Sequence, residues 1–404
     1  MNEEWAQSTL GEVADLTIGR TPPRGESRFW TDDLTRPFCT IADMPEGGGW
    51  FTPGREGVTE AAESEGKAKR VAAGSLLMSF KLTIGRIAFP SEDVFPNEAI
   101  VHIQPHDDGP VTKEYLALWL SSQDLAAGSG RAVKGNTLNG KSLKAIPVVY
   151  PPLAVQRRIV DLMEHLDNQV NLLQAEADSG SALITPLFRS LVLGSVTDSE
   201  PVPLRRVGKF IRGRRFTKRD YVPSGLGCIH YGQVHTHFGP VTWETLTFVA
   251  DQMRSRLRLA KPGDVVIAAA SEDVAGLGKA TVWLGDDEVA VHDDCYIFRH
   301  DLDPKFASYL FASSWFQEQK QKFASGTKVT RISGDDLAQI QAPIPDITEQ
   351  IRIGETMHSL SGEADAVRAE SVALKELRAS LLDELLSGRA DIPDSYSDLL
   401  GVAS

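Results

Sequence analysis

Residues 151–159 form the stretch that decides the architecture of this chain, and they read Pro151-Pro152-Leu153-Ala154-Val155-Gln156-Arg157-Arg158-Ile159. A related stretch follows 194 residues later as Pro345-Asp346-Ile347-Thr348-Glu349-Gln350-Ile351-Arg352-Ile353. In both stretches, proline precedes a long run of helix-forming residues, and proline just ahead of a helix marks its start. The pair therefore predicts two long helices that begin at equivalent places in two copies of one unit.

The same offset of 194 residues relates positions along the whole chain. It matches Leu10 with Leu204, Val13 with Val207, Gly19 with Gly213, Arg20 with Arg214, Leu143 with Leu337, Ile146 with Ile340, Leu191 with Leu385 and Gly194 with Gly388. Solenoid repeats have periods of roughly 20–50 residues, so this period is too long for a solenoid. We expect a duplicated domain, in which each copy is a globular part followed by a helix, with pseudo-two-fold symmetry.

Each predicted helix carries a narrow apolar seam whose members are spaced alternately by four and three residues. The first seam is Ile159, Met163, Leu166, Val170, Leu173, Ala177, Gly180, Ile184, Leu187 and Leu191. The second is Ile353, Met357, Leu360, Ala364, Val367, Ser371, Leu374, Arg378, Leu381 and Leu385. Such seams are typical of a coiled coil, although the same spacing also serves ordinary core packing. We expect an antiparallel pair that holds the globular parts at opposite ends, with a kink at Pro186.

Strand-like and helix-like stretches occur together in both globular parts. Residues 13–18 and 207–211 have the character of short strands, and residues 115–120 and 306–311 that of short helices. We therefore predict an α+β fold with two similar globular domains. The predicted boundaries are a first globular domain at 1–150, a helix with linker at 151–202, a second globular domain at 203–345, a second helix at 346–390 and a C-terminal tail at 391–404.

The bulk composition excludes several classes of protein. The chain has 42% hydrophobic and 24% charged residues, as globular proteins have. No apolar run approaches the roughly 18–20 residues of a membrane span, and the first residues lack the features of a secretory signal. The cysteines, Cys39, Cys228 and Cys295, have no disulfide or zinc-binding spacing. We expect a cytoplasmic protein that contacts no membrane.

The net charge of −13 is unevenly distributed. Lys and Arg number 15 against 20 Asp and Glu in residues 1–150, and 19 against 16 in residues 203–345. The helical segments 151–202 and 346–404 have balances of −4 and −7, so most of the excess negative charge lies there. An acidic chain can still bind DNA, because only the surface that meets phosphate has to be positive.

The sequence contains no recognisable catalytic motif. It has no phosphate-binding glycine loop, no serine nucleophile elbow and no Asn/Asp-Pro-Pro-aromatic tetrapeptide of the amino-methyltransferases. The spacing of Asp264, Glu272 and Lys279 matches a nuclease only in a generic way. Two groups could ligate a metal, namely His230 with His235 and His237, and His292 with Asp293, Asp294 and Cys295. Neither has a complete ligand spacing, so capping or recognition roles are favoured, and we expect neither a catalytic residue nor a metal.

Basic side chains recur at matching places in both copies, most densely in residues 205–219. Lys and Arg neutralise DNA phosphates, whereas Arg, Asn and Gln can read base edges through paired hydrogen bonds. A single cluster can be merely a solvated face, but its recurrence favours a DNA-binding surface. The predicted DNA-binding residues are Arg20, Lys81, Arg86, Arg131, Lys134, Asn136, Asn139 and Lys141 in the first copy, and Arg212, Arg214, Arg215, Lys218, Arg219, Gln233, Lys279, Lys328 and Arg331 in the second.

The order of domain, Pro-Pro-Leu-x-x-Gln helix start, domain and second helix resembles the specificity subunit of type I restriction-modification systems. The starts at 151–159 and 345–353 carry this resemblance, with glycine landmarks at Gly74 and Gly263 and at Gly135 and Gly326. The resemblance covers essentially the whole chain. It implies a non-catalytic subunit with two target-recognition domains, each of which reads one half of a bipartite, asymmetric site in double-stranded DNA.

The resemblance also implies partners. Two methyltransferase subunits would dock on the helices and would carry S-adenosylmethionine, so that this chain itself binds no cofactor. A restriction subunit would join through them. The seam residues expected at the docking surface are Gln156, Ile159, Met163, Leu166 and Val170 in the first helix, and Gln350, Ile353, Met357, Leu360 and Val367 in the second. The alternatives are a DNA methyltransferase or nuclease with an unrecognised active site, and a coiled-coil scaffold that binds only protein.

Overall fold

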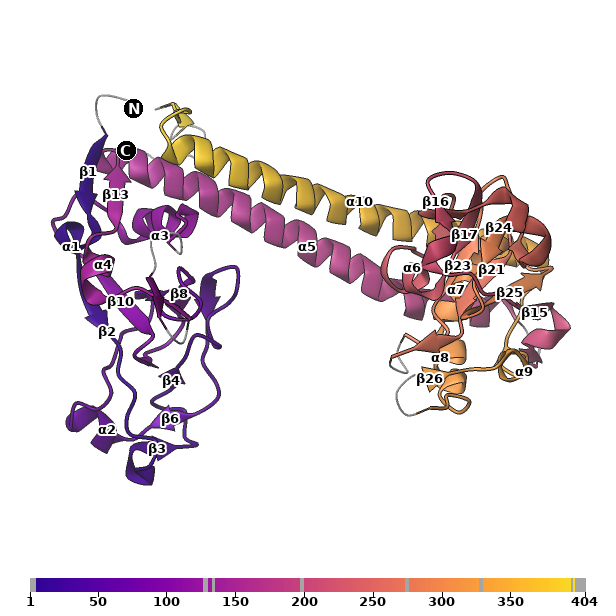
Figure 1. Cartoon of the computed structure of the whole chain (residues 1–404), viewed down its shortest axis with the longest axis horizontal. Coiled ribbons are helices and arrows are strands. Elements are labelled where there is room, and N and C mark those ends of the chain that lie inside the picture. The colour runs from indigo at the N-terminus through magenta and orange to yellow at the C-terminus, as the bar shows by residue number, and fades with distance from the viewer. Residues whose placement is uncertain are drawn as a thin grey trace. The chain divides into compact units, whose positions relative to one another are not determined.

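The computed structural model describes residues 5–125, 130–132, 135–196, 200–272, 276–326, 330–393 and 395–396. For residues 130–132 and 135–137 it describes the backbone alone. The chain forms two compact units, residues 1–170 with 372–404 and residues 171–371 (Figure 1). No helix of the described residues is long and apolar enough to cross a membrane.

The first globular domain is built on a five-stranded sheet in the order β2-β10-β7-β8-β5. Strand β10 runs antiparallel to both of its neighbours, β7 runs antiparallel to β8, and the outermost strand β5 runs parallel to β8. Helix α3 (Lys113–Ser122) packs its Tyr115 and Leu120 into the core of this domain. The strands are β2 (Ala14–Ile18), β5 (Gly49–Phe51), β7 (Leu76–Ser79), β8 (Ile87–Pro90) and β10 (Ile100–Pro105).

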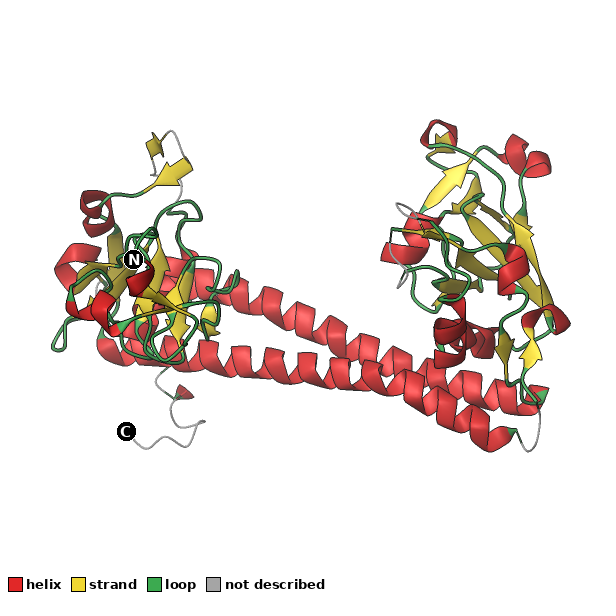
Figure 2. Ribbon diagram, turned by 90° about the horizontal axis from the view of Figure 1, so that it is seen from below, coloured by secondary structure: helices red, strands yellow, loops and turns green. Residues whose placement is uncertain are grey.

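The second globular domain repeats this sheet in the order β15-β25-β21-β23-β18, again with a parallel outermost strand. Helix α7 (Pro304–Ala312) corresponds to α3. The strands are β15 (Gly208–Arg212), β18 (Val241–Thr242), β21 (Val265–Ala268), β23 (Ala280–Trp283) and β25 (Cys295–His300). The predicted α+β class with two similar domains is therefore confirmed (Figure 2).

The remaining elements are short. In the first domain they are β1 (Ala6–Thr9), α1 (Leu10–Val13), η1 (Ser27–Phe29), β3 (Trp30–Thr31), β4 (Phe38–Cys39), β6 (Gly57–Val58), α2 (Glu60–Ser64), β9 (Phe95–Pro96), β11 (Gly130–Ala132), β12 (Gly135–Thr137), α4 (Gly140–Lys144) and β13 (Pro147–Tyr150). In the second they are β14 (Val202–Pro203), η2 (Leu204–Arg206), η3 (Lys218–Asp220), β16 (Tyr221–Val222), β17 (Leu226–Ile229), α6 (Tyr231–Thr236), β19 (Thr247–Val249), η4 (Asp251–Arg256), β20 (Leu259–Ala260), β22 (Ala270–Ser271), β24 (Val289–Val291), α8 (Ser314–Lys320), β26 (Thr330–Arg331), α9 (Gly334–Leu337) and β27 (Gln341–Ala342).

The matched glycines, Gly19 and Gly213, are needed because the backbone passes another strand closely. The N–H of Gly19 donates to the carbonyl oxygen of Ile100, and that of Gly213 to the carbonyl oxygen of Cys295, both at 3.0 Å. A Cβ atom on Gly19 would lie 2.2 Å from two carbonyl oxygens, and one on Gly213 would lie 2.0 Å from the carbonyl oxygen of His292. No side chain fits at such distances, which explains why the 194-residue offset preserves glycine here.

Helices α5 (Leu153–Ser195) and α10 (Ile347–Leu386) follow the two domains and begin close to the predicted starts. In the first unit, Met163 near the start of α5 shares a core cluster with Leu385 near the end of α10. In the second unit, Met357 near the start of α10 shares one with Phe188 near the end of α5. Within each unit the two helices therefore run antiparallel. Helix α5 continues through Pro186, and the kink there stays a prediction.

The seams serve both core packing and helix pairing. Ile159 and Ile353 are buried in the cores of the domains, while Ala177, Ala364 and Ser371 are buried along the middle of the helices. A Cβ atom on Gly180 would lie 3.4 Å from the Cβ of Ala364, so small residues do bring the helices together. Each compact unit therefore contains one globular domain with a part of both helices.

The predicted C-terminal tail is partly incorporated into the first unit. Ile392 is buried and belongs to the same core cluster as Leu386 of α10. The chain beyond the helix therefore contributes to packing at least as far as this residue.

Candidate nucleic-acid interface

The segment that links β15 to β16 in the second domain is strongly basic. Arg214, Arg215, Lys218 and Arg219 are all exposed there. Their side chains make no hydrogen bond or ion pair with other described residues, so four positive charges face the solvent. Such unneutralised cations are what a DNA backbone requires.

Local contacts hold this segment in place. The backbone N–H of Arg214 donates to the carbonyl oxygen of Val291 at 2.9 Å, and Phe216 is buried in the domain. At the start of η3, the carboxylate of Asp220 accepts hydrogen bonds from the N–H and the hydroxyl of Thr217, which lower the pKa of Asp220. The positive side chains are therefore displayed on an ordered loop rather than on a free tail.

A hollow of about 250 Å³ lies between β15, β25 and β26 of this domain. It brings together Arg212 and Arg331, which are far apart in the sequence, with the carboxylates of Asp293, Asp294 and Asp336. The Nε of Arg212 already donates to the carbonyl oxygen of Asp293 at 3.0 Å. Arginine can donate to guanine and aspartate can accept from cytosine, so this hollow offers the groups that read base edges.

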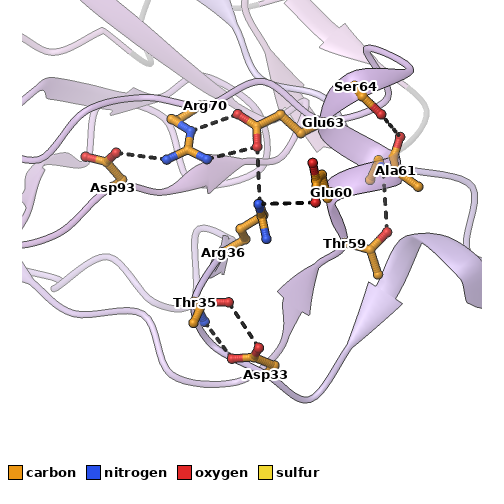
Figure 3. Close-up of polar contacts among 11 residues, drawn as sticks. Asp33, Thr35, Arg36, Thr59, Glu60, Ala61, Glu63, Ser64, Arg70 and Asp93 are labelled. Carbon is orange, nitrogen blue, oxygen red and sulfur yellow. Dashed lines mark hydrogen bonds and ion pairs between the residues drawn. The ribbon is translucent and has the colours of Figure 1, made fainter.

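Several arginines of the first domain are arranged differently, because carboxylates of the same domain neutralise them (Figure 3). Arg70 donates to Glu63 at 2.8 and 2.9 Å and to Asp93 at 3.2 Å. These bonds raise the pKa of Arg70, and they lower that of Glu63. Arg36 also reaches Glu63, at 3.3 Å.

Two further pairs follow the same rule. Arg24 forms a two-pronged bond with Glu56 at 2.6 and 2.8 Å, and its guanidinium lies over the ring of Trp30. Arg28 bonds Glu65 and Glu26 and lowers the pKa of Glu65. These arginines of the first domain are therefore bound to carboxylates of the same domain.

We compared the sequence and the structure with known proteins. Residues 2–178 match the model of the type I restriction modification DNA specificity domain. These residues belong to that family. The second domain repeats the same sheet order, which makes it a second copy of the same fold.

The chain is 24% identical over 270 residues to the type I restriction enzyme MjaVIII specificity subunit of Methanocaldococcus jannaschii, and the match covers 62% of this chain and 63% of that relative. It is 24% identical over 169 residues to the HindI specificity subunit of Haemophilus influenzae, a match that covers 40% of this chain and 36% of the relative. The chain therefore aligns with less than two thirds of the length of these relatives.

Two solved structures share the fold over nearly the whole chain. A structure from a study of complex assembly in a type I restriction-modification system superposes with a TM-score of 0.62 at 18% identity, and covers 96% of this chain and 98% of that one. The S subunit from M. genitalium superposes with a TM-score of 0.55 at 13% identity, and covers 97% and 98%. The order of two α+β domains, each followed by a long helix, is thus the fold of these two structures.

Several residues predicted to bind DNA have other roles in the specificity domains. Arg86 donates from Nη1 to the carbonyl oxygens of Ile41 and Met44, and its side chain is only 15% exposed. Gln233 is buried, where it accepts from the N–H of His230 and donates to Thr247. These contacts stabilise the domain and leave neither side chain suited to DNA, which corrects the prediction for both.

The other residues predicted to bind DNA differ in how much their side chains are exposed and hydrogen-bonded within the chain. Asn139 caps α4 by accepting from two backbone N–H groups, so its oxygen is occupied. Arg20 donates to the carbonyl oxygen of Gly66 at 2.7 Å and Lys279 to that of His235 at 2.8 Å, although both are exposed. The amine of Lys81 lies 5.3 Å from the ring centre of Phe80. Lys141 is exposed.

Four predicted positions lie wholly or partly outside the described residues. Lys134 and Lys328 are outside them, as are the side chains of Arg131 and Asn136. Their assignment to DNA stays a prediction.

One of the two candidate metal groups, His292 with Asp293 and Asp294, comes together in the structure. The ligand atoms of His292, Asp293 and Asp294 lie within 4.8 Å of one another. His292 is held on its other side by the carbonyl oxygen of Phe216, 2.9 Å from Nε2, so it supports the basic segment. Cys295 points into the core, where burial raises its pKa.

Gln156 and Gln350 join each specificity domain to its helix. Gln156 is 0% exposed, accepts from the N–H of Thr112 at 2.9 Å and donates to the carbonyl oxygens of Pro110 and Pro151. Gln350 is 5% exposed, accepts from the N–H of Asp303 at 2.9 Å and donates to Pro345. Both amides are therefore buried where the domain meets its helix. The prediction that they lie on a docking surface needs correction.

The other seam residues also face inward. Ile159, Met163, Val170, Ile353 and Met357 are buried, and Leu166, Leu360 and Val367 are partly buried. A partner protein would instead meet the exposed aliphatic side chains of the helices. Two pairs of these are related by the 194-residue offset, namely Leu153 with Ile347 and Leu183 with Leu377.

Proposed function

We propose that this chain is the non-catalytic DNA sequence-specificity subunit of a cytoplasmic type I restriction-modification complex. Each specificity domain would read one half of a bipartite, asymmetric site in double-stranded DNA. The observation that carries the proposal is that two domains share one sheet order but present loops of different charge. A shared frame with divergent loops suits two half-sites of different sequence.

The helices would hold the two half-sites at a fixed spacing and would dock two methyltransferase subunits. Exposed aliphatic residues at equivalent places, such as Leu183 and Leu377, support binding of the same partner twice. The methyltransferase subunits would supply S-adenosylmethionine, and restriction subunits would join through them. The described residues of this chain need then contribute only recognition and assembly.

A domain exchange tests the proposal. Residues 203–345 are replaced by the corresponding domain of another family member, and the methylated sites in host DNA are sequenced in the presence of the partner subunits. Exactly one half of the methylated motif is expected to change, because the second domain reads only its own half-site. Exchange of residues 1–150 is the matched control and is expected to change the other half.

A change in both halves, or in neither, would show that the two domains do not divide the site. Methylation in cells that carry this chain without partner genes would instead reveal an active site in the chain itself.

A further inference from the structure

One surface residue of the first domain has a backbone conformation that its side chain disfavours. Leu82, in the loop between β7 and β8, has a φ of 64°, and it is the only non-glycine residue with a positive φ among those that the structure describes. Its side chain is 69% exposed. A lone exposed leucine needs no explanation, but a left-handed backbone costs a bulky residue free energy that glycine would avoid. Strain of this kind is concentrated at binding sites.

Hydrogen bonds hold the loop in this strained form. The carbonyl oxygen of Ser79 accepts from the N–H of Gly85 at 2.8 Å, and the Ser79 hydroxyl accepts from the N–H of Arg86 at 3.0 Å. The same hydroxyl donates to the carbonyl oxygen of Thr83. Leu82 is therefore presented to the solvent on an ordered turn.

A second exposed apolar residue, Ile18, lies at the same end of the sheet. It ends β2, pairs with Val101 near the start of β10 and is 36% exposed. Strand β7 flanks β10 on the other side and also ends beside the start of β10, where the N–H of Phe80 donates to the carbonyl oxygen of Ala99 at 3.0 Å. The loop that carries Leu82 begins at this point.

Strand pairing makes Arg212 the counterpart of Ile18 in the second domain. Arg212 ends β15 as Ile18 ends β2, and each is followed by the glycine that approaches a neighbouring strand closely. Their partners, Tyr296 and Val101, each pair on the other side with β21 or β7. Arg212 lines the hollow that offers base-reading groups. The equivalent end of the first sheet is therefore where that domain would meet base edges.

The loop after β7 corresponds to the same hollow. Ala269 is the counterpart of Phe80, because its N–H donates to the carbonyl oxygen of Asp294 at 2.8 Å, just before β25. Ala269 and the next residue, Ala270, both line the hollow. Leu82 lies two residues after Phe80, so it follows the stretch of chain that corresponds to this wall.

Cations accompany both apolar residues. Arg20 is exposed two residues after Ile18, and Lys81 directly precedes Leu82. Such a surface suits DNA, because phosphates border the grooves and the methyl group of thymine lies within the major groove. The side chains of isoleucine and leucine have no hydrogen-bonding group for a base edge, whereas a methyl group offers them an apolar contact.

We propose that Ile18 and Leu82 read thymine in the first half-site through its methyl group, at the place where the second domain presents Arg212 and carboxylates. This inference rests on the proposed function and adds to it the kind of base that the first domain selects. The strain at Leu82 then serves to hold an apolar side chain toward the groove.

The test removes the methyl group from the DNA. The methylated motif is first sequenced with the partner subunits present, and the exchange of residues 1–150 identifies the half-site of the first domain. Each thymine of that half-site is then replaced in turn by deoxyuridine, and the affinity of the assembled complex is measured by fluorescence anisotropy. At least one replacement is expected to weaken binding about three- to fivefold, as loss of one buried methyl group predicts.

A variant that combines Ile18→Ala with Leu82→Gly should bind the thymine and deoxyuridine sites equally. Glycine adopts the backbone conformation of Leu82 without strain, so this change should leave the first unit folded, which its thermal unfolding checks. Leu34→Ala truncates another exposed leucine of the same domain and is the matched control. It should keep the full preference for thymine.

A preference for thymine that survives in the combined variant would overturn the inference. So would a first half-site in which replacement of every thymine by deoxyuridine leaves the affinity unchanged, or one that contains no thymine on either strand. The proposed function fails separately, if exchange of residues 1–150 changes both halves of the motif or neither.

Discussion

The two globular domains share a sheet order, but arginines on their loops differ in whether a carboxylate of the same domain binds them. In the first domain, Arg24, Arg28 and Arg70 are bound to carboxylates of the same domain. In the second, Arg214 and Arg215 are exposed and have no such partner among the described residues. The sheet order and the close glycine approaches are the same in both. Duplication therefore preserved the scaffold while the charge available to a ligand diverged.

This difference bears on binding more than on stability. Exposed ion pairs typically contribute about 0–1 kcal/mol to folding, so the pairs of the first domain are no major source of stability. They do reduce the charge that the domain offers to phosphate, because a bound carboxylate must first be displaced. No described carboxylate is paired with the basic segment of the second domain. We therefore expect this domain to make most of the salt-sensitive contacts with DNA.

The largest expected effect comes from removing the exposed cations of the second domain. Replacing Arg214, Arg215, Lys218 and Arg219 together with alanine should lower DNA affinity by about a thousandfold at 0.15 M salt, if each contacts one phosphate. The salt dependence should fall by about 3–4 units, since each contact contributes about 0.9. Affinity measured by fluorescence anisotropy at several salt concentrations gives both quantities.

The matched variant replaces Arg24, Arg28 and Arg70 of the first domain with alanine. Because these side chains are already paired, the salt dependence should change by less than about one unit. Equal slopes for the two variants would remove the electrostatic distinction between the domains.

A second prediction probes what the domains share. Gly19→Ala and Gly213→Ala should each destabilise their unit by about 2–3 kcal/mol, because the new Cβ would overlap carbonyl oxygens. Denaturant unfolding, followed for each unit by hydrogen exchange, measures this. Gly25→Ala and Gly239→Ala are matched controls, since a Cβ at either position meets no atom within 4 Å. Sensitivity in only one domain would show that the frame is not shared at this point.

The smallest expected effect is a pH dependence confined to the first domain. Arg70 lowers the pKa of Glu63 below its ordinary value of 4.5, so the bond stabilises the folded state above this value and is lost as the pH falls through the lowered pKa. The contribution should be less than about 1 kcal/mol, because the pair is largely exposed.

Arg70→Gln measures this contribution. Its destabilisation of the first unit, followed by hydrogen exchange of α2, should be present at pH 7 and should vanish as the pH falls well below 4.5. A difference that persisted in acid would mean that Arg70 acts through packing against Phe95 rather than through charge, since its guanidinium lies 5.4 Å from that ring.

Much of the architecture could be predicted because it depends on local patterns. The starts of both helices follow from proline and from seams at helical spacing, and the duplication follows from an offset of 194 residues that recurs at many positions. Gly19 and Gly213 could be paired from the sequence, although the reason for glycine could not, since it lies in the carbonyl groups of a distant strand.

The roles of individual polar side chains were harder to predict. Gln156 and Gln350 have the spacing of docking residues, yet their amides satisfy backbone groups 44 and 47 residues away. Arg86 has the charge of a DNA contact, yet it caps carbonyl groups more than 40 residues earlier in the chain. In each case the partner that fixes the role is distant in sequence, so no local pattern reveals it.

The sequence by itself determined that this protein is a duplicated chain of two α+β domains, each followed by a long helix. Apolar periodicity, proline and glycine are enough for that, because they act through the local backbone. Only the tertiary structure decided which charges remain available to a ligand. Arg28 and Glu65 are 37 residues apart and become partners only when the loops fold together. Arg214 and its neighbours meet no carboxylate among the residues that the structure describes, and the loop that carries them is anchored by backbone bonds and by Phe216.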